Sequence, residues 1–363
     1  MVAARVLLFT NSARRNGGAG YELGLSALQE SGEIGGFHAT SGRELMKDHG
    51  RQAPEALARM IRECAADIVV VFSPFYFTTT DAQWEDLLAA LTGRTVLYWE
   101  GDPWGRGKPI TRAMSRWLSR ADMVFAVAGP PSSGLLRRHG ARHVCLIPHV
   151  YSQVHFANAE AVWEPIPAPA VDCVMIASNS TRTRIPIPTL TGLPGGLPRY
   201  RLGWHLTHDR GRESRVYGFG WPRGWHVEPC EFDQQTTVVR GARVSANWDN
   251  YPRLASYTSD RLAISMLAGR PHVSTRHPAM ELFPGADEGV YFESSVGDIL
   301  HRVDEMLARG DEEINRLGRA AWSWVRFRLS ERELMRHMLA AACEDVAPVR
   351  MDPWRSLSTA DSA

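Results

Sequence analysis

A segment in the second half of the chain, SANWDNYPRLASYTSDRLAISMLAG (245–269), has the clearest potential for chemistry. An apolar run ends at Asn247, and after a polar loop Thr258, Ser259 and Asp260 open a helical pattern that closes at an Ala-Gly pair. Hydroxyl residues are typical of helix starts and glycine of helix ends. A helix start aimed into a cleft presents unpaired N–H groups and a positive dipole, which suits a diphosphate. An ordinary capped helix is the alternative interpretation.

Two segments of the first half carry side chains suited to binding or proton transfer. Asn11 opens a glycine-rich turn in which Gly17 and Gly18 would let the backbone approach a phosphate or a sugar. This turn lacks the G-x-G-x-x-G spacing of a dinucleotide site. Glu100 and Asp102 follow an apolar strand pattern, where a carboxylate is suited to orient an acceptor hydroxyl or to act as a general base. A plain turn is the alternative.

His149 follows the last strand pattern of the first half and is the third candidate for a catalytic base. A histidine packed against the sheet is the alternative interpretation. The chain contains no H-E-x-x-H, C-x-x-C, G-x-S-x-G or Walker A motif, which disfavours zinc, serine-hydrolase and ATPase chemistry. Its five cysteines are widely spaced, which favours a reducing cytosol, so we expect a cytoplasmic protein.

The elements that must position these residues alternate along the chain as apolar runs and amphipathic helical stretches, which is typical of parallel α/β sheets. We predict strands at 6–10, 68–72, 95–99, 123–127, 144–147, 171–177, 215–219, 244–247, 272–274 and 290–292. We predict helices near 19–30, 53–66, 82–91, 109–120, 132–139, 233–241, 259–268, 295–308, 311–328 and 331–343. The stretch 185–212, rich in Pro, Gly and Arg, is predicted as a loop.

The length of 363 residues predicts two domains. We expect a Rossmann-like N-terminal domain over 1–150, a proline-rich linker over 151–170 and a second Rossmann-like domain over 171–330. Two such halves place a ligand cleft between the carboxyl edges of their sheets.

The charge balance and the hydropathy exclude two kinds of partner. With 41 basic and 40 acidic residues the formal net charge is +1, so we expect no nucleic-acid partner and no attraction to a lipid surface. The chain has no run of 18 apolar residues, so no membrane span is expected, and its start is too weakly apolar for a signal peptide.

Residues 170–343 resemble the C-terminal donor domain of GT-B glycosyltransferases and are most similar to the CgeB-like group. The likeness rests on a strand, a helix closed by Ala-Gly, a proline, a second strand and the phrase Glu-Leu-Phe-Pro-Gly. The matching residues are Arg261, Ala268, Gly269, Glu281, Phe283 and Gly285, followed by Leu317-Gly318-Arg319-Ala320. The resemblance is thinner over 1–150. It implies two Rossmann-like, doubly wound domains facing across a cleft, with a last helix over 331–345 that returns to the first domain.

The resemblance also implies roles for single residues. Arg182 and Arg184 would face the donor diphosphate, and Trp221 would stack on the nucleotide base, with a place in the core as its alternative. The family acid that binds the ribose falls at Ile264, so Asp260 or Glu281 takes that task or donor binding is weakened. The expected donor-binding residues are Ser178, Arg182, Arg184, Trp221, Asn247, Thr258, Ser259, Asp260, Arg261 and Glu281.

We therefore predict a glycosyltransferase of the hexosyltransferase type that moves a sugar from a nucleoside diphosphate to a small soluble acceptor, such as a secondary-metabolite aglycone or an aminocyclitol. The acceptor would lie near 11–18 and 100–104. The resemblance implies no metal and no cofactor, and it favours retention of configuration. The alternatives are a nucleotide-sugar epimerase of the same fold and an inactive binding or scaffold protein, which the loss of the acid at Ile264 makes more credible.

Overall fold

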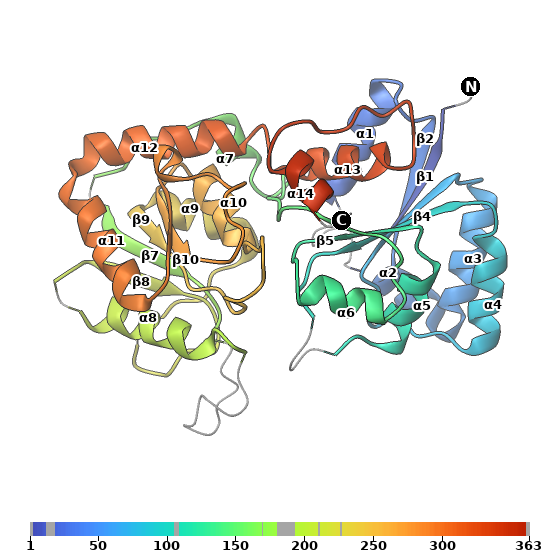
Figure 1. Cartoon of the computed structure of the whole chain (residues 1–363), viewed down its shortest axis with the longest axis horizontal. Helices are drawn as coiled ribbons and strands as arrows, with labels where there is room; N and C mark the ends of the chain where they lie inside the picture. Colours follow the sequence, from blue (N-terminus) through green and yellow to red (C-terminus); the bar gives the residue numbers. More distant parts are fainter. Residues whose placement is uncertain are drawn as a thin grey trace. The chain divides into compact units, whose positions relative to one another are not determined.

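The protein divides into two compact units (Figure 1). Unit 1 contains Met1–Pro148 and Glu331–Ala363, and unit 2 contains His149–Ser330. This computed structural model describes residues 3–11, 19–104, 109–168, 170–179, 193–209, 211–225 and 227–360. The segment 151–170, which the sequence predicts to be a linker, belongs to unit 2 and includes the short helix α7 (Ala157–Ala161).

Unit 1 is built on a parallel sheet with the strand order β2-β1-β3-β4-β5-β6. Its strands are β1 (Arg5–Thr10), β2 (Gly36–Ser41), β3 (Ile68–Phe72), β4 (Thr95–Glu100), β5 (Met123–Ala126) and β6 (Val144–Leu146). Its helices are α1 (Ala19–Glu30), α2 (Gly42–His49), α3 (Ala53–Glu63), α4 (Asp81–Ala90), α5 (Arg112–Arg120), α6 (Ser132–Arg138), α13 (Glu331–Ala340) and α14 (Trp354–Ala360).

Helices cover both faces of this sheet. On one face, the apolar sides of α3, α4, α5 and α6 pack on alternate strand residues such as Phe9 and Val71, which are fully buried. On the other face lie α1 and α13 (Figure 1). There Tyr21 contacts Phe72, and His337 contacts Phe125. A strand buried on both faces reads as a continuous apolar run, which explains why IVVVF of β3 is readily predicted from sequence.

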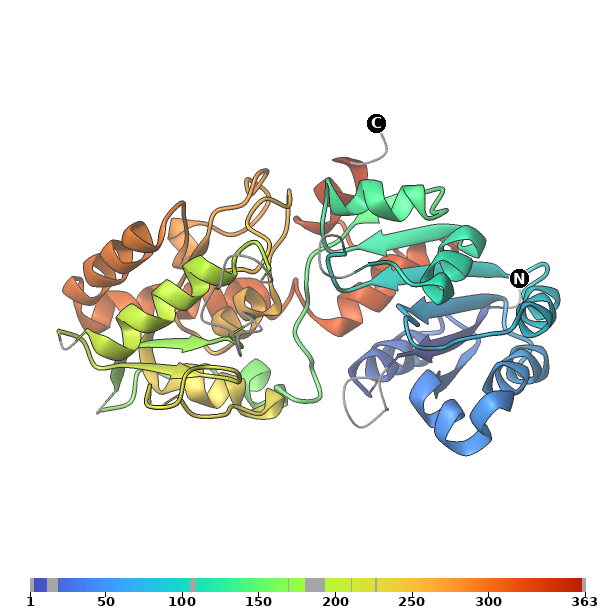
Figure 2. The same ribbon diagram turned by 90° about the horizontal axis from the view of Figure 1, so that it is seen from below.

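Unit 2 is built on a second parallel sheet, with the order β11-β10-β9-β7-β8. Its strands are β7 (Val171–Ile176), β8 (Ser214–Tyr217), β9 (Ala242–Ala246), β10 (His272–Thr275) and β11 (Val290–Glu293). Besides α7, its helices are α8 (Gly196–His208), α9 (Gln235–Arg240), α10 (Asp260–Leu267), α11 (Val296–Ala308) and α12 (Gly310–Val325). Helices α8 and α11 cover one face and α9 and α10 the other (Figure 2).

The α/β class is confirmed, and the ten predicted strands are present to within two residues at each end. Two corrections concern segments without a strong apolar pattern. Residues 36–41 form β2, an edge strand whose sequence GFHATS carries few β-branched apolar residues. Residues 196–208, predicted as part of a loop, form helix α8 although they include Pro198 and Gly203.

The two sheets each contain a point where the strand order reverses. In unit 1 the chain runs from β1 outward to β2 and then to β3 on the opposite side of β1; in unit 2 it runs from β7 to β8 and then to β9 on the opposite side of β7. Ligands of open parallel sheets bind outside the carboxyl ends of the strands at such reversals. These two points, β1/β3 and β7/β9, are therefore where the candidate site residues must be sought.

Candidate functional site

Arg199 lies across the reversal point of unit 2. It belongs to α8, and its side chain donates from Nε to the carbonyl oxygen of Trp248 at 2.6 Å and from Nη1 to the carbonyl oxygen of Ser178 at 3.3 Å. Ser178 follows β7 and Trp248 follows β9. Burial lowers the pKa of the Arg199 guanidinium, and the nearby Asp249 carboxylate opposes that shift. A buried cation is thus fixed where the fold places a ligand.

Asp249 and His277 form a buried ion pair between the loops that follow β9 and β10. Asp249 Oδ2 lies 3.0 Å from His277 Nε2, and both side chains are almost fully inaccessible. Nδ1 of His277 faces the carbonyl oxygen of Leu254 at 3.2 Å. A carbonyl oxygen can only accept, so Nδ1 donates to it, while Nε2 donates to the carboxylate.

The carboxylate of Asp249 is held in its ionised form by these neighbours. Burial opposes ionisation, but the hydrogen bond and charge of His277 outweigh it and, with a smaller contribution from the Ser259 hydroxyl, lower the pKa of Asp249. Asp249 Oδ1 accepts from Asn247 Nδ2 at 2.7 Å, and the Asp249 backbone N–H donates to Thr275 Oγ1 at 2.8 Å. The loops after β9 and β10 are thus joined by side chains that are hidden from solvent.

Helix α10 starts beside this pair. Its N-cap residue is Ser259, whose Oγ accepts from Asn247 Nδ2 at 3.4 Å but makes no capping bond to the described first turn of the helix. Asn247 is 1% exposed, and its Oδ1 has no partner among the described residues. The preceding Thr258 is buried as well. The N–H groups of the first turn are therefore not occupied by the N-cap side chain.

The first two residues of α10 form an ion pair at the end of β7. Arg261 Nη1 lies 2.7 Å from Asp260 Oδ2 and 3.1 Å from Gln235 Oε1, and its Nε donates to the carbonyl oxygen of Ile176 at 2.9 Å. Arg199 and Arg261 thus both reach the carboxyl end of β7. The charge of Arg261 lowers the pKa of Arg199, and that of Asp260 raises it.

Ile264, which stands where the resemblance expects a ribose-binding acid, points into the protein. It is 1% exposed and lines a small pocket together with Ser245, Ser265 and His272. The Ser245 hydroxyl lies 2.9 Å from His272 Nδ1, and burial lowers the pKa of His272 to about 4. Of the two acids considered as substitutes, Asp260 is half-buried and Glu281 is exposed.

Trp221 is fixed at the same edge of the sheet. Its indole N–H donates to the carbonyl oxygen of Ala177, the residue after β7, at 2.7 Å. Its ring is half-buried against Tyr200 and Trp225, with centroid distances of 6.5 and 5.7 Å. The side chain of Ser178 is exposed, and Arg182 and Arg184 lie outside the described residues.

Unit 1 gathers Asn11, Glu100 and Asp102 at its own reversal point. Asn11, directly after β1, donates from Nδ2 to the carbonyl oxygen of Ser73, directly after β3, at 3.3 Å. The Ser73 hydroxyl donates to Glu100 Oε2 at 2.7 Å, and the Asp102 backbone N–H donates to Glu100 Oε1 at 3.1 Å. Glu100 is 2% exposed, whereas Asp102 is exposed. Gly17 and Gly18 lie outside the described residues.

Burial raises the pKa of Glu100 to about 7, although hydrogen bonds from Trp104 and Ser73 oppose the shift. The hydroxyl of Tyr98 also donates to Glu100 Oε2, at 3.1 Å. The carboxyl group of Glu100 is thus surrounded by donors from the residue after β3, from β4 and from the turn after β4. Such a group is suited to hold the turn that carries Asp102, and Asp102 is the acid at this edge that solvent reaches.

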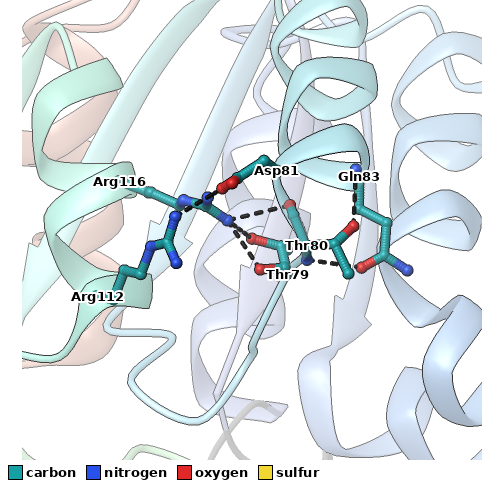
Figure 3. A network of polar contacts seen from close by, with 6 residues as sticks. All are labelled: Thr79, Thr80, Asp81, Gln83, Arg112 and Arg116. Carbon is teal, nitrogen blue, oxygen red and sulfur yellow. Dashed lines mark hydrogen bonds and ion pairs between the residues drawn. The ribbon is translucent and has the colours of Figure 1, made fainter.

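The connection from β3 to α4 is fixed by a polar network (Figure 3). Arg116 of α5 donates to the carbonyl oxygen of Thr79 at 2.8 Å and to that of Thr80 at 3.1 Å, and it also pairs with Asp81. Arg112, from the same helix, pairs with Asp81 at 2.6 Å. This network anchors the connection that begins with Ser73, and thereby supports the contacts of Ser73 to Asn11 and Glu100.

His149 is the first residue of unit 2. Its half-buried ring meets Tyr257 edge-on at a centroid distance of 5.9 Å, and Tyr257 meets His277 in the same way at 5.3 Å. His149 is therefore connected through Tyr257 to the buried ion pair.

Sequence reasoning missed Arg199, Asp249 and His277. Arg199 lies in the stretch predicted as a loop. Asp249 stands three residues after the end of β9, and His277 stands two residues after the end of β10. The rule that parallel strands end at one edge of the sheet was therefore available to find them. The order of the strands, which the sequence does not state, was the missing information.

The described parts of the chain offer neither a metal site nor a membrane-spanning helix. They contain no group of three or more His, Cys, Asp or Glu side chains arranged to hold a metal ion. Within the same ranges, no helix has the length and apolar character needed to cross a membrane.

Comparison with known proteins places the fold. No protein-family model and no curated protein matches the chain. Solved structures do match over nearly the whole length. One is a sucrose-phosphate synthase from Thermosynechococcus elongatus, with 13% identity, coverage of 93% of this chain and 100% of that chain, and a TM-score of 0.58. A second is Anabaena HepE in complex with UDP, with 10% identity, coverage of 93% and 99%, and a TM-score of 0.54.

A third is an alpha-glucosyltransferase in complex with UDP and a 13-mer DNA, with 10% identity, coverage of 95% and 99%, and a TM-score of 0.61. Identities of this size establish a fold and leave the activity to be argued from the site. The chain has the GT-B fold, with two Rossmann-like units that are each built on a parallel sheet.

Proposed function

We propose that this protein is a glycosyltransferase that uses a nucleoside-diphosphate sugar as donor, and that the donor binds at the β7/β9 edge of unit 2. The observation that carries the proposal is the position of Arg199, a buried guanidinium bonded to the ends of both strands at the reversal point. The start of α10, which lacks a capping side chain within the described chain, adds N–H groups at the same edge.

The chemistry follows from the charge of the leaving group. As the bond to the sugar breaks, the nucleoside diphosphate gains negative charge, and cations fixed in place stabilise it without reorganisation. Arg199 and the dipole of α10 supply this stabilisation, and we propose that Arg182 and Arg184 complete it. Because protein charges suffice for this task, the proposal includes no metal and no further cofactor.

For the acceptor we propose the β1/β3 edge of unit 1 and a small soluble polyol, such as an aminocyclitol or another natural-product aglycone. Asp102 is exposed there and is suited to orient or deprotonate an acceptor hydroxyl, while the buried Glu100 positions its turn. The CgeB-like resemblance of 170–343 and the UDP complexes of the structural neighbours support the donor class. The widely spaced cysteines support a cytoplasmic location.

The test is a transfer assay with UDP-, dTDP-, GDP- and ADP-glucose against a panel of aminocyclitols and aglycones, read by mass spectrometry of both products. We expect one donor to give a glycoside and the matching free diphosphate. A duplex DNA belongs in the panel because one neighbour was solved with DNA, although the net charge of +1 argues against it. An isomerised donor without acceptor would show an epimerase instead, and no turnover or binding of any donor would contradict the proposal.

A further inference from the structure

The N-cap residue of α10 differs from several other N-caps of this protein. Ser41, Thr80, Thr111 and Ser295 each accept a hydrogen bond from a backbone N–H of the helix that they begin. Ser259 has the same extended backbone conformation, with φ −80° and ψ 164°, yet makes no such bond within the described chain. Ser259 is therefore a residue type that normally caps a helix, but its hydroxyl bonds to a different part of the protein.

The hydroxyl of Ser259 is used by the loop after β9. It accepts from Asn247 Nδ2 at 3.4 Å, and it is close enough to Asp249 to favour the charged form of that carboxylate. Asn247 in turn donates to Asp249 Oδ1 at 2.7 Å. We name Asn247, Asp249, Ser259 and His277 the Asp249 cluster.

His277 makes this arrangement rigid. Its ring lies 3.0 Å from Asp249 Oδ2 and is fully buried, so the carboxylate cannot turn toward α10 without breaking a buried ion pair. A second link joins the same two loops, because the Ser256 N–H donates to the carbonyl oxygen of Pro278 at 2.8 Å. The loop after β10 therefore fixes the position of Asp249. The groups that bond to Ser259 belong to the loop after β9 and not to α10.

The third N–H group of the first turn, that of Leu262, donates to the backbone carbonyl oxygen of Ser259 at 3.1 Å. We propose that Asp249 and His277 are positioning residues that draw the Ser259 hydroxyl away from α10, so that the N–H groups of Asp260 and Arg261 stay open for the donor diphosphate. This inference deepens the proposed function and rests on it for the identity of the ligand. Neither residue touches the donor in this scheme. They act through Ser259, at a helix start where Asn247 Oδ1 is also buried without a partner among the described residues.

The test uses Asp249→Asn, a substitution that keeps the shape of the side chain. A neutral His277 ring can still donate from Nδ1 to the Leu254 carbonyl oxygen and can accept from the new amide at Nε2. The substitution therefore leaves no buried charge without a partner. The loss of the negative charge frees the Ser259 hydroxyl to cap α10. We expect slower hydrogen exchange at the first-turn amides without any ligand, and about tenfold weaker binding of UDP, the scale of one capping interaction.

Removal of the hydroxyl separates this mechanism from general damage. In Asp249→Asn with Ser259→Ala the cap is gone, so the exchange rates and the UDP affinity should return toward those of the wild type. Ser295→Ala removes the side-chain cap of α11 and is the matched control. Combined with Asp249→Asn, it should restore neither the exchange rates of α10 nor the UDP affinity. The melting temperature gives a third readout: Ser259→Ala should lower it more in the Asp249→Asn background than in the wild type, because only there does Ser259 cap the helix.

Unchanged exchange in a folded Asp249→Asn variant, or a loss of affinity that Ser259→Ala does not restore, would overturn the inference. Should Asp249→Asn fail to fold, Asn247→Ala serves in its place, because it leaves the buried ion pair intact and removes one bond to Ser259; its effects should have the same direction. The exchange and melting measurements need no donor. If the wild type bound no nucleotide, the proposed function would be refuted. The exchange and melting measurements would still decide whether Asp249 keeps Ser259 from capping α10.

Discussion

Arg199 donates a hydrogen bond of 2.6 Å from Nε to the carbonyl oxygen of Trp248. This bond joins the helix that follows β7 to the loop that follows β9, across the point where the strand order of unit 2 reverses. Because Arg199 also bonds to Ser178, its guanidinium is fixed by two backbone carbonyls. The positive charge of Arg199 is thereby held in one place at this edge of the sheet.

Arg199→Ala tests this role. We expect UDP to bind at least about tenfold more weakly, because a positive charge fixed at the proposed donor edge is lost. Stability should fall too, since the carbonyl groups of Trp248 and Ser178 lose a hydrogen-bond donor. Arg201→Ala on the same helix is the control: that side chain is exposed, and its removal should leave the affinity unchanged. Equal UDP affinities of a folded Arg199→Ala variant and the wild type would contradict the assignment.

The double variant Arg182→Ala with Arg184→Ala addresses the basic residues that the sequence places after β7. We expect a fall in kcat because the departing diphosphate loses two compensating charges, while the melting temperature stays that of the wild type. The comparison of kcat with the KM for the donor shows whether the loss occurs in the transition state. Turnover at the wild-type rate would refute a diphosphate role for these two residues.

Glu100 makes unit 1 less stable as the pH rises. Its folded pKa of about 7 lies above the ordinary value of 4.5, so between these values the folded state keeps a proton that the unfolded chain has released. Stability should therefore fall from pH 4.5 to 7 and then level off, by up to about 3 kcal/mol. Glu100→Gln should remove this dependence and be more stable than the wild type at pH 8.

The measurement is urea unfolding at pH 5 and pH 8, with Glu85→Gln on the exposed side of α4 as the control. The control should follow the wild type at both values. A Glu100→Gln variant that is destabilised equally at pH 5 and pH 8 would show that the burial of the charge is not the cause.

Unit 2 should become less stable as the pH falls, which is the opposite of the dependence that Glu100 gives unit 1. Burial lowers the pKa of His272 from the ordinary 6.5 to about 4. Between these two pH values the imidazole is protonated in the unfolded chain and neutral in the folded protein. Its contribution to stability is present above pH 6.5 and declines by up to about 3 kcal/mol toward pH 4. The lowered pKa of Asp249 adds a further loss at still lower pH, when its carboxylate is protonated in the folded state.

His272→Gln should flatten the dependence between pH 4 and 6.5 in unfolding curves followed by tryptophan fluorescence. His301→Gln, at an exposed position of α11, should leave it as in the wild type. If His272→Gln retained the full loss of stability over this window, another group would have to be responsible.

The regular parts of the fold were predictable because their residues repeat a simple pattern. Strand β3 is apolar throughout and is buried on both faces, and α3 repeats apolar residues at helical spacing. Strand β2 and helix α8 were missed because their stability comes from their neighbours. The GFHATS sequence of β2 becomes a strand through its pairing with β1, and α8 is held by buried residues such as Leu202 and Leu206.

The site was predicted in part for a similar reason. Asn247 and the start of α10 were found because they follow a strand with a clear apolar pattern. The partners that decide their geometry are distant in sequence: Asp249 and His277 are 28 residues apart, and Arg199 reaches Trp248 across 49 residues. Such pairings depend on the order of strands in the sheet, which local patterns do not encode.

The most direct test of the account is calorimetric titration of the purified full chain with UDP, dTDP, GDP and ADP, alongside Arg199→Ala. The account predicts that one of these diphosphates binds to a single site with a clear preference over the others, and that the substitution weakens this binding without unfolding the protein. Absence of binding for all four nucleotides, or binding that is indifferent to Arg199, would contradict a donor site at the β7/β9 edge.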